Sequence, residues 1–165
     1  MEEIRRNNST IKNMSVMVIL LLGAMTHVNA QQAYTKYCNA RYGFCVEYPV
    51  NYGTEPASYN NDGRVFYDNE GYSMRAYGSY NALENSLEAE MREGEKEFDV
   101  ITYRVSKNNW YVLSGYKDDD IIYIKTYMSR DKRIFYHLRI QYPSKFKIEY
   151  NDIVSKASRS FSPGS

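Results

Sequence analysis

The residue types in this chain that could carry out chemistry are few and scattered. Of its two histidines, only His137 lies outside the first thirty residues. Imidazole titrates near neutral pH, so His137 is the natural candidate for a general base. A Ser–His–Asp arrangement would need Ser114 or Ser129 beside it, and the sequence contains no Gly-x-Ser-x-Gly motif. The simpler interpretation makes His137 a polar sheet residue that faces solvent or a helix edge.

Two groups of acidic residues could hold a cation or perform acid–base catalysis. Asp118, Asp119 and Asp120 offer hard oxygens to Ca²⁺, but consecutive side chains diverge, which favours the tip of a turn. Glutamates between residues 84 and 97 could include a glycosidase pair, although a solvated helix face explains them more simply. Two cysteines and one histidine fall short of four zinc ligands. We therefore predict no catalytic residue, no metal site, no cofactor and no enzymatic activity.

The first thirty residues have the pattern of a secretory signal peptide. A basic start precedes the uncharged apolar run 14–25, and Val28-Asn29-Ala30 ends the segment with small residues where a signal peptidase reads. We predict cleavage after Ala30. A transmembrane anchor needs roughly 17–25 apolar residues, which this run lacks. The alternative is an uncleaved amphipathic or core helix. The favoured interpretation places the protein in the periplasm or outside the cell, with no stable membrane anchor after cleavage.

The cysteine usage agrees with export. Cys38 and Cys45 are the only cysteines, and they lie in the stretch CNARYGFC. Because exported compartments are oxidising, we predict a disulfide between them. Asn39 and Gly43 supply turn-compatible residues within the loop. The chain-entropy relation gives this bridge about 2.5 kcal/mol of stabilisation. Two free, buried thiols are the alternative.

Composition narrows the class of protein. The 165-residue chain has a net charge of +1, and without the predicted leader the charge is zero. This balance argues against a nucleic-acid-binding protein that relies on a large basic surface. Hydrophobic residues make up 43% of the chain, which is too many for a disordered protein. We expect a signal peptide at 1–30, a polar segment at 31–41, one domain at 42–162 and a tail at 163–165.

Hydrophobic periodicity predicts two amphipathic helices. Residues 82–93 have helical spacing, with a capping box formed by Asn81 and Glu84 and a stop at Gly94. A second helical period extends over residues 146–161. Residues 31–37 are expected to fray, and 51–63 to form a loop. The predicted strands are 44–48, 64–67, 72–77, 100–107, 110–117, 121–128 and 133–142. The last four form an antiparallel meander, so the fold class is α+β, an antiparallel sheet flanked by two helices in an α/β/α sandwich.

Tyrosine is the least ordinary feature of the sequence, with 18 copies. Tyrosine is enriched at interfaces, where one end of the side chain is apolar and the other is wet. Alternation places Tyr123, Lys125 and Tyr127 on one face of strand 121–128. A protein-binding or glycan-binding patch is one interpretation, and ordinary cross-strand packing beneath a helix is the other. The candidate binding residues are Trp110, Tyr111, Tyr116, Tyr123 and Tyr127.

The order of these elements resembles the PsbP-like superfamily. Three stretches carry the likeness, namely FCVEYP at 44–49, WYVLSGY with DIIYIK at 110–125, and LRIQYP at 138–143 followed by the last helix. The resemblance covers most of residues 42–162. It extends to the secreted bacterial envelope members, the DcrB-like proteins among them. The family implies a sheet flanked by helices and binding, adaptor or assembly roles, without a shared catalytic set.

Leader, charge and aromatic content together predict an exported, non-catalytic binding or adaptor protein. Its expected partner is a protein of the bacterial envelope or of the secreted fraction, and an immunity protein against an exported toxin is one version of this hypothesis. No nucleic-acid partner is expected. A glycan-binding or small-molecule-binding module is the first alternative. A small hydrolase that uses His137 is the second.

Overall fold

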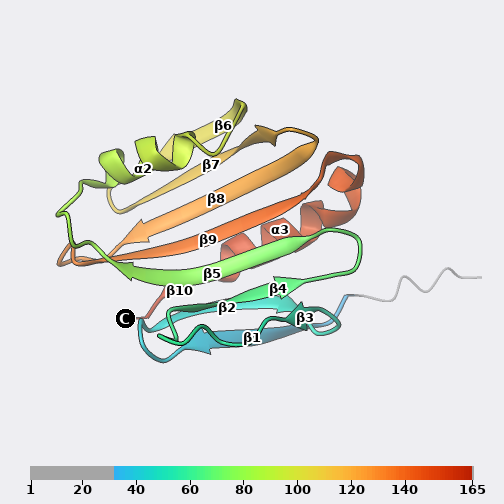
Figure 1. Cartoon of the computed structure of the whole chain (residues 1–165), viewed down its shortest axis with the longest axis horizontal. Coiled ribbons are helices and arrows are strands. Elements are labelled where there is room, and N and C mark those ends of the chain that lie inside the picture. Colours follow the sequence, from blue (N-terminus) through green and yellow to red (C-terminus); the bar gives the residue numbers. More distant parts are fainter. Residues whose placement is uncertain (1–31, 165) are drawn as a thin grey trace, which may run out of the picture. The chain divides into compact units, whose positions relative to one another are not determined.

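The chain folds around a seven-stranded antiparallel sheet. The structure, a computed structural model, describes residues 32–164, and the predicted leader with its cleavage position Ala30 lies outside them. The strand order is β3-β4-β5-β9-β8-β7-β6 (Figure 1). The strands are β3 (Gly53–Thr54), β4 (Gly63–Tyr67), β5 (Ser73–Tyr80), β6 (Val100–Ser106), β7 (Trp110–Lys117), β8 (Asp120–Met128) and β9 (Ile134–Pro143).

A second, three-stranded sheet was not predicted. It has the order β1-β2-β10, formed by β1 (Tyr34–Asn39), β2 (Phe44–Pro49) and β10 (Ser162–Pro163). The expectation that residues 31–37 fray is therefore wrong for the part that forms β1. Likewise, part of the expected tail pairs with β2. Both errors have one cause, because these short segments gain strand structure only from their pairing with β2.

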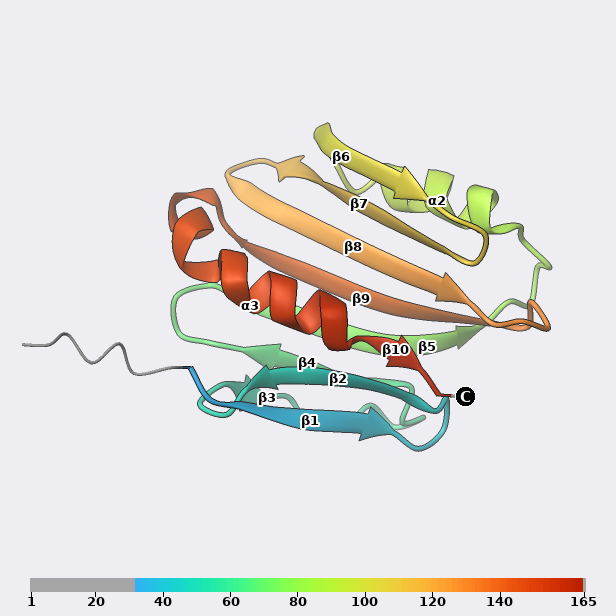
Figure 2. The same ribbon diagram turned by 180° about the vertical axis from the view of Figure 1, so that it is seen from behind.

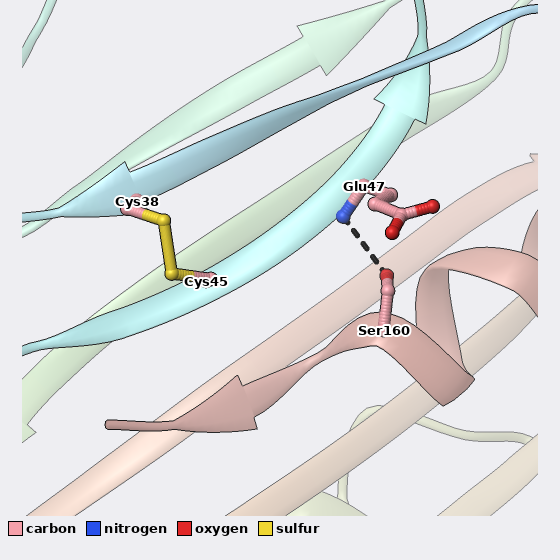
Figure 3. Close-up of a disulfide and its surroundings, with 4 residues drawn as sticks. All are labelled: Cys38, Cys45, Glu47 and Ser160. Atoms are coloured by element: carbon pink, nitrogen blue, oxygen red, sulfur yellow. Dashed lines mark hydrogen bonds between the residues drawn. A yellow bond between two sulfur atoms is a disulfide. The ribbon is translucent and has the colours of Figure 1, made fainter. Parts of the chain in front are cut away.

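The predicted disulfide is confirmed. Cys38 and Cys45 stand opposite each other in the register of β1 and β2, with their Cα atoms 4.1 Å apart, and are joined by a disulfide (Figure 3). Next to this bridge, the Glu47 N–H donates a hydrogen bond of 2.9 Å to the Ser160 Oγ. The hairpin at the start of the described chain is therefore fastened to the helix at its end.

The two helices cover opposite faces of the large sheet. Helix α2 (Leu87–Glu95) lies on one face, and α3 (Lys147–Ser160), preceded by the 3-10 turn η1 (Ser144–Phe146), lies on the other (Figures 1 and 2). The small sheet lies on the same side as α3. The predicted α+β class with two flanking helices is confirmed. No helix within residues 32–164 has both the length and the apolar character required to cross a membrane.

Alternation along the strands produces two cores. On β9, Tyr136, Leu138 and Ile140 face α3 and the small sheet, where they join the larger core. Phe135, which directly precedes Tyr136 on the strand, points to the opposite face and joins a smaller core under α2 that includes Leu87. This two-sided burial explains why the central strands are apolar on both faces.

The first helix starts later than predicted. Its N-cap is Ser86, whose side chain accepts a hydrogen bond of 3.1 Å from the Ala89 N–H. The predicted capping box is wrong, because Glu84 has a positive φ of 53° and lies outside the helix. Asn81 instead accepts from the Asn85 N–H, so it orders the loop before the helix. The helix continues through the predicted stop at Gly94 to Glu95.

Candidate binding groove

His137 lies on the α2 side of the sheet and is buried, so it does not face solvent. Only 6% of its surface is exposed. Its Nε2 lies 3.1 Å from the Ser79 Oγ, and its Nδ1 lies 3.2 Å from the Thr126 Oγ1. The ring of Tyr77 stacks on the imidazole at a centroid distance of 4.5 Å. Two hydroxyl groups therefore engage both ring nitrogens, as expected for a satisfied buried histidine.

The environment of His137 does not favour general-base catalysis. Burial, together with the nearby Arg75 guanidinium, lowers the pKa of His137 to about 4. The hydroxyl within reach is that of Ser79, whereas the sequence suggested Ser114 or Ser129. No carboxylate contacts the imidazole among the hydrogen bonds of residues 32–164. Without a carboxylate to stabilise an imidazolium, the pair lacks the third member of a hydrolytic triad.

The acidic residues serve as turn and surface groups. Asp118 has a positive φ of 51° at the turn between β7 and β8, and its N–H donates to an Asp99 carboxylate oxygen. Asp120 begins β8, and its carboxylate accepts a hydrogen bond from Gln141. In the described part of the chain, no three His, Cys, Asp or Glu side chains form a group that could hold a metal ion.

The five predicted binding residues do not form one cluster. Tyr111 is 1% exposed and belongs to the core under α2, where its hydroxyl donates to the Glu90 carbonyl oxygen. Its neighbour Trp110 lies on the opposite face, because successive strand residues point to opposite sides. Including Tyr111 in a surface patch was therefore wrong. Trp110 and Tyr127 pair with a centroid distance of 6.4 Å, and the Lys125 Nζ lies 5.0 Å from the Tyr127 ring centre.

The other two predicted residues, Tyr116 and Tyr123, line a groove beside helix α3, which we name the α3 groove. It has a volume of about 480 Å³ and lies between α3 and the strands β6, β7 and β8. In Figure 2, α3 lies in front of β9, while β6 and β7 are not covered by the helix. The strand wall contains Thr102, Tyr103, Ser114, Tyr116, Ile121 and Tyr123.

The opposite wall is a polar stripe of α3 that sequence reasoning did not single out. Its members recur at helical spacing, and they are Lys147, Asn151, Ser155, Ser158 and Arg159. Because i, i+4 and i+8 positions share one face of a helix, this stripe runs along the helix beside the apolar face that packs on the sheet. The helical period from residue 146 to 161 contained this signal, but the strands that the stripe faces depend on tertiary packing.

Contacts between the walls set the width of the groove. The Tyr123 hydroxyl lies 2.6 Å from the Ser158 Oγ. The Lys125 Nζ donates a hydrogen bond of 2.8 Å to the Ser158 carbonyl oxygen. Burial raises the pKa of Tyr123, so its hydroxyl stays protonated at neutral pH. Strand β8 is thereby fixed to the last part of α3.

The edge strand β6 completes the groove. The register of β6 against β7 shifts between Ile101 and Tyr103, which marks a β-bulge. Gly115 on β7 lies under this bulge, since a Cβ atom there would come within 2.0 Å of the Val100 carbonyl oxygen. The close backbone approach brings Tyr103 to the groove, where 55% of its surface remains exposed.

The electrostatic character of the groove is positive. Lys147 and Arg159 belong to its lining, and no aspartate or glutamate lines it within residues 32–164. The Lys147 side chain makes no hydrogen bond or ion pair with the described residues. Among the partners that residues 32–164 offer, Arg159 donates to the Ser155 Oγ alone, at 3.1 Å, so its remaining donors are available there. The groove therefore combines tyrosine rings, neutral hydrogen-bonding groups and two available cations.

The architecture defines an α+β protein with a PsbP-like fold, as the sequence predicted. The chain is similar to the solution structure of cyanobacterial PsbP (CyanoP) from Synechocystis sp. PCC 6803, with a TM-score of 0.61 and 12% sequence identity. The alignment covers 87% of this chain and 99% of that chain. No family model and no curated protein matches the sequence. At this identity the likeness establishes the fold, and membership of the envelope subgroup stays a prediction.

Proposed function

We propose that this chain is an exported, non-catalytic binding protein that captures a protein of the envelope or secreted fraction in the α3 groove. The observation that carries the proposal is the groove itself, with exposed tyrosine on one wall and available cations on the other. Tyrosine and arginine are enriched at protein interfaces, where they supply much of the binding energy.

The surface next to the groove supports a protein as the ligand. On the same side of the sheet, Lys125 lies over the rings of both Trp110 and Tyr127. This second aromatic group is half-buried, and it extends the candidate contact surface beyond the residues that line the groove. Stable protein interfaces bury about 800 Å² on each partner, so a protein ligand would contact surface beside the groove as well as the groove itself.

The disulfide supports export, because such bridges form and persist in oxidising compartments. Cleavage after Ala30 is tested on the exported product itself. The full chain is expressed in a host that secretes it, and the purified product is examined by N-terminal sequencing. The expected first residue is Gln31. An intact N-terminus on the exported product would contradict the predicted cleavage.

The binding proposal is tested by affinity capture from a native envelope extract, followed by mass spectrometry. The bait is the exported product of the full chain, as wild type and as Tyr103→Ala. Because Tyr103 is 55% exposed, its truncation leaves the core intact. We expect one dominant protein with the wild type and about thirtyfold weaker binding with Tyr103→Ala, the effect of losing an interface hot spot.

Tyr59→Ala is the matched control. Tyr59 is a fully exposed tyrosine in the loop between β3 and β4, and it does not line the groove. Its truncation should leave capture unchanged. The proposed function is wrong if the wild type captures no protein above an unrelated exported bait. It is also wrong if Tyr103→Ala captures the same protein as strongly as Tyr59→Ala does.

A further inference from the structure

We infer that the α3 groove binds an extended acidic protein segment that lies along α3 with carboxylates at Lys147 and Arg159. This inference rests on the proposed function and names the chemistry of the partner. It draws on three properties of the groove, which are its length, its charge and the arrangement of its rings.

The two cations lie at opposite ends of the groove. Lys147 is the first residue of α3, and Arg159 is in its last turn. Twelve residues of α-helix separate them, which corresponds to about 18 Å along the axis at 1.5 Å per residue. An extended chain advances roughly 3.3 Å per residue, so five or six residues span this distance. Acidic side chains near both ends of such a segment reach both cations.

The charges of the groove select an acidic segment. Both cations belong to the lining, and no carboxylate of the described chain neutralises them there. Within the described chain, Lys147 makes no ion pair, and Arg159 has only the neutral Ser155 as a hydrogen-bond partner. A basic ligand would meet like charge at both ends, and a neutral ligand would leave both cations without a counter-charge. Complementary charge sets which partner binds and speeds its association.

The space between the cations suits a polypeptide backbone. Asn151, Ser155 and Ser158 follow one another along the helix wall, and Thr102 and Ser114 face them from the strands. Amide and hydroxyl groups can both donate and accept, as a peptide backbone requires. The Asn151 side chain has no hydrogen-bond partner among residues 32–164, so its donors and acceptor are available.

The ring geometry disfavours a saccharide. A sugar-binding platform needs two coplanar aromatic rings along the groove. Within the described chain, no stacked ring pair joins any two of Tyr103, Tyr116 and Tyr123. Rings that do not stack can instead contact individual side chains of an extended segment, whose successive side chains point to opposite sides.

The test uses two hexapeptide libraries with blocked ends. They have the same four randomised central positions, and they differ only in Glu or Gln at the first and last positions. Binding to the exported full-chain product is measured by fluorescence anisotropy. We expect the Glu library to bind about tenfold more tightly than the Gln library. The difference should shrink when NaCl rises from about 50 to 500 mM, because salt screens exposed charges.

Charge variants test whether Lys147 and Arg159 cause the preference for the Glu library. Lys147→Glu should weaken binding of the Glu library about tenfold, and a glutamate in the first turn of α3 suits the helix dipole. Arg159→Gln should have a similar effect, and it avoids placing a negative charge at the helix C-terminus. Arg130→Glu, on the turn between β8 and β9 outside the groove, is the matched control and should bind as the wild type does.

Each outcome decides between the two proposals. Equal binding of the two libraries, or binding that Lys147→Glu leaves unchanged, overturns the acidic-segment inference. Binding of trigalacturonate, an acidic trisaccharide, in place of both libraries overturns it in favour of a glycan. If neither probe binds while protein capture still depends on Tyr103, the inference falls and the proposed function stands. If that capture also fails, both fall.

Discussion

The Tyr123 hydroxyl on β8 lies 2.6 Å from the Ser158 Oγ on α3, and this pair joins the two walls of the α3 groove. Lys125 donates to the carbonyl oxygen of the same serine. Three groups thus meet at one point between the sheet and the helix. The position of α3, and with it the width of the groove, depends on contacts that are half-buried and shielded from competing water.

Removing one partner of this hydrogen bond should cost more than removing both. Ser158→Ala leaves the half-buried Tyr123 hydroxyl without its partner, so we expect the free energy of unfolding to fall by about 1–2 kcal/mol. Tyr123→Phe combined with Ser158→Ala should restore part of this loss. Urea unfolding of the two single variants and the double variant gives the coupling energy. Strictly additive losses would contradict the contact.

The stability of the protein should depend on pH through His137. The pKa of the folded imidazole is about 4, and the ordinary value is 6.5. Above pH 6.5, both the folded and the unfolded forms hold a neutral imidazole, so the protein has its full stability. As the pH falls from 6.5 toward 4, only the unfolded chain takes up the proton. The free energy of unfolding should therefore decrease by about 3 kcal/mol over this window.

The measurement compares urea unfolding of the wild type and His137→Gln at several pH values between 7 and 4. The variant lacks the titrating group, so its profile should be flatter by up to about 1.4 kcal/mol per pH unit. The comparison uses only the slope of the free energy of unfolding against pH, so it remains valid if the variant is less stable at every pH. Parallel profiles would show that His137 is not buried in its neutral form.

Reduction of the Cys38–Cys45 disulfide should destabilise the domain. The bridge closes a short loop between β1 and β2, and its loss should lower the free energy of unfolding by about 2.5 kcal/mol. Urea unfolding with and without dithiothreitol measures this loss. The double variant Cys38→Ser, Cys45→Ser should not respond to the reductant. A response in that variant would assign the effect to the reagent.

Gly115→Ala should displace β6. The new Cβ would lie 2.0 Å from the Val100 carbonyl oxygen and 2.8 Å from the Ile101 Cα, so backbone has to move. We expect a loss of about 1–3 kcal/mol in unfolding free energy, together with weaker partner capture because Tyr103 moves. Gly94→Ala is the control, since its closest neighbour is the terminal hydroxyl of Tyr111 at 3.1 Å. Unchanged stability of Gly115→Ala would contradict the close packing under the bulge.

The sequence predicted those elements whose signal is local. The four strands from residue 100 to residue 143 follow from alternation and short turns, and the last helix follows from its period. Strand β1 was missed because its residues are polar and it depends on pairing with β2. The start of α2 was misplaced because Asn81 and Ser86 are both capable of capping, and only the folded loop decides which one does.

The candidate site was only partly predicted, because some of its residues have a local sequence signal and others depend on tertiary packing. Tyr116 and Tyr123 were both named as candidate binding residues from the sequence, and both line the groove. Strict use of strand alternation would have separated Tyr111 from Trp110, its neighbour on the same strand. Lys147 and Arg159 could not be assigned to a site from sequence, because the packing angle of α3 decides which strands its polar stripe faces.

The hydrogen bond between Glu47 and Ser160 connects positions 113 residues apart in the chain, and β10 pairs with the same strand β2. Such distant contacts make folding slow, because nearly the whole chain has to be closed into a loop before they form. The small sheet and the larger core therefore stay incomplete until α3 and residue 163 are available. For a chain exported as proposed, this order delays the final collapse and keeps the polypeptide competent for translocation until its last helix has been synthesised.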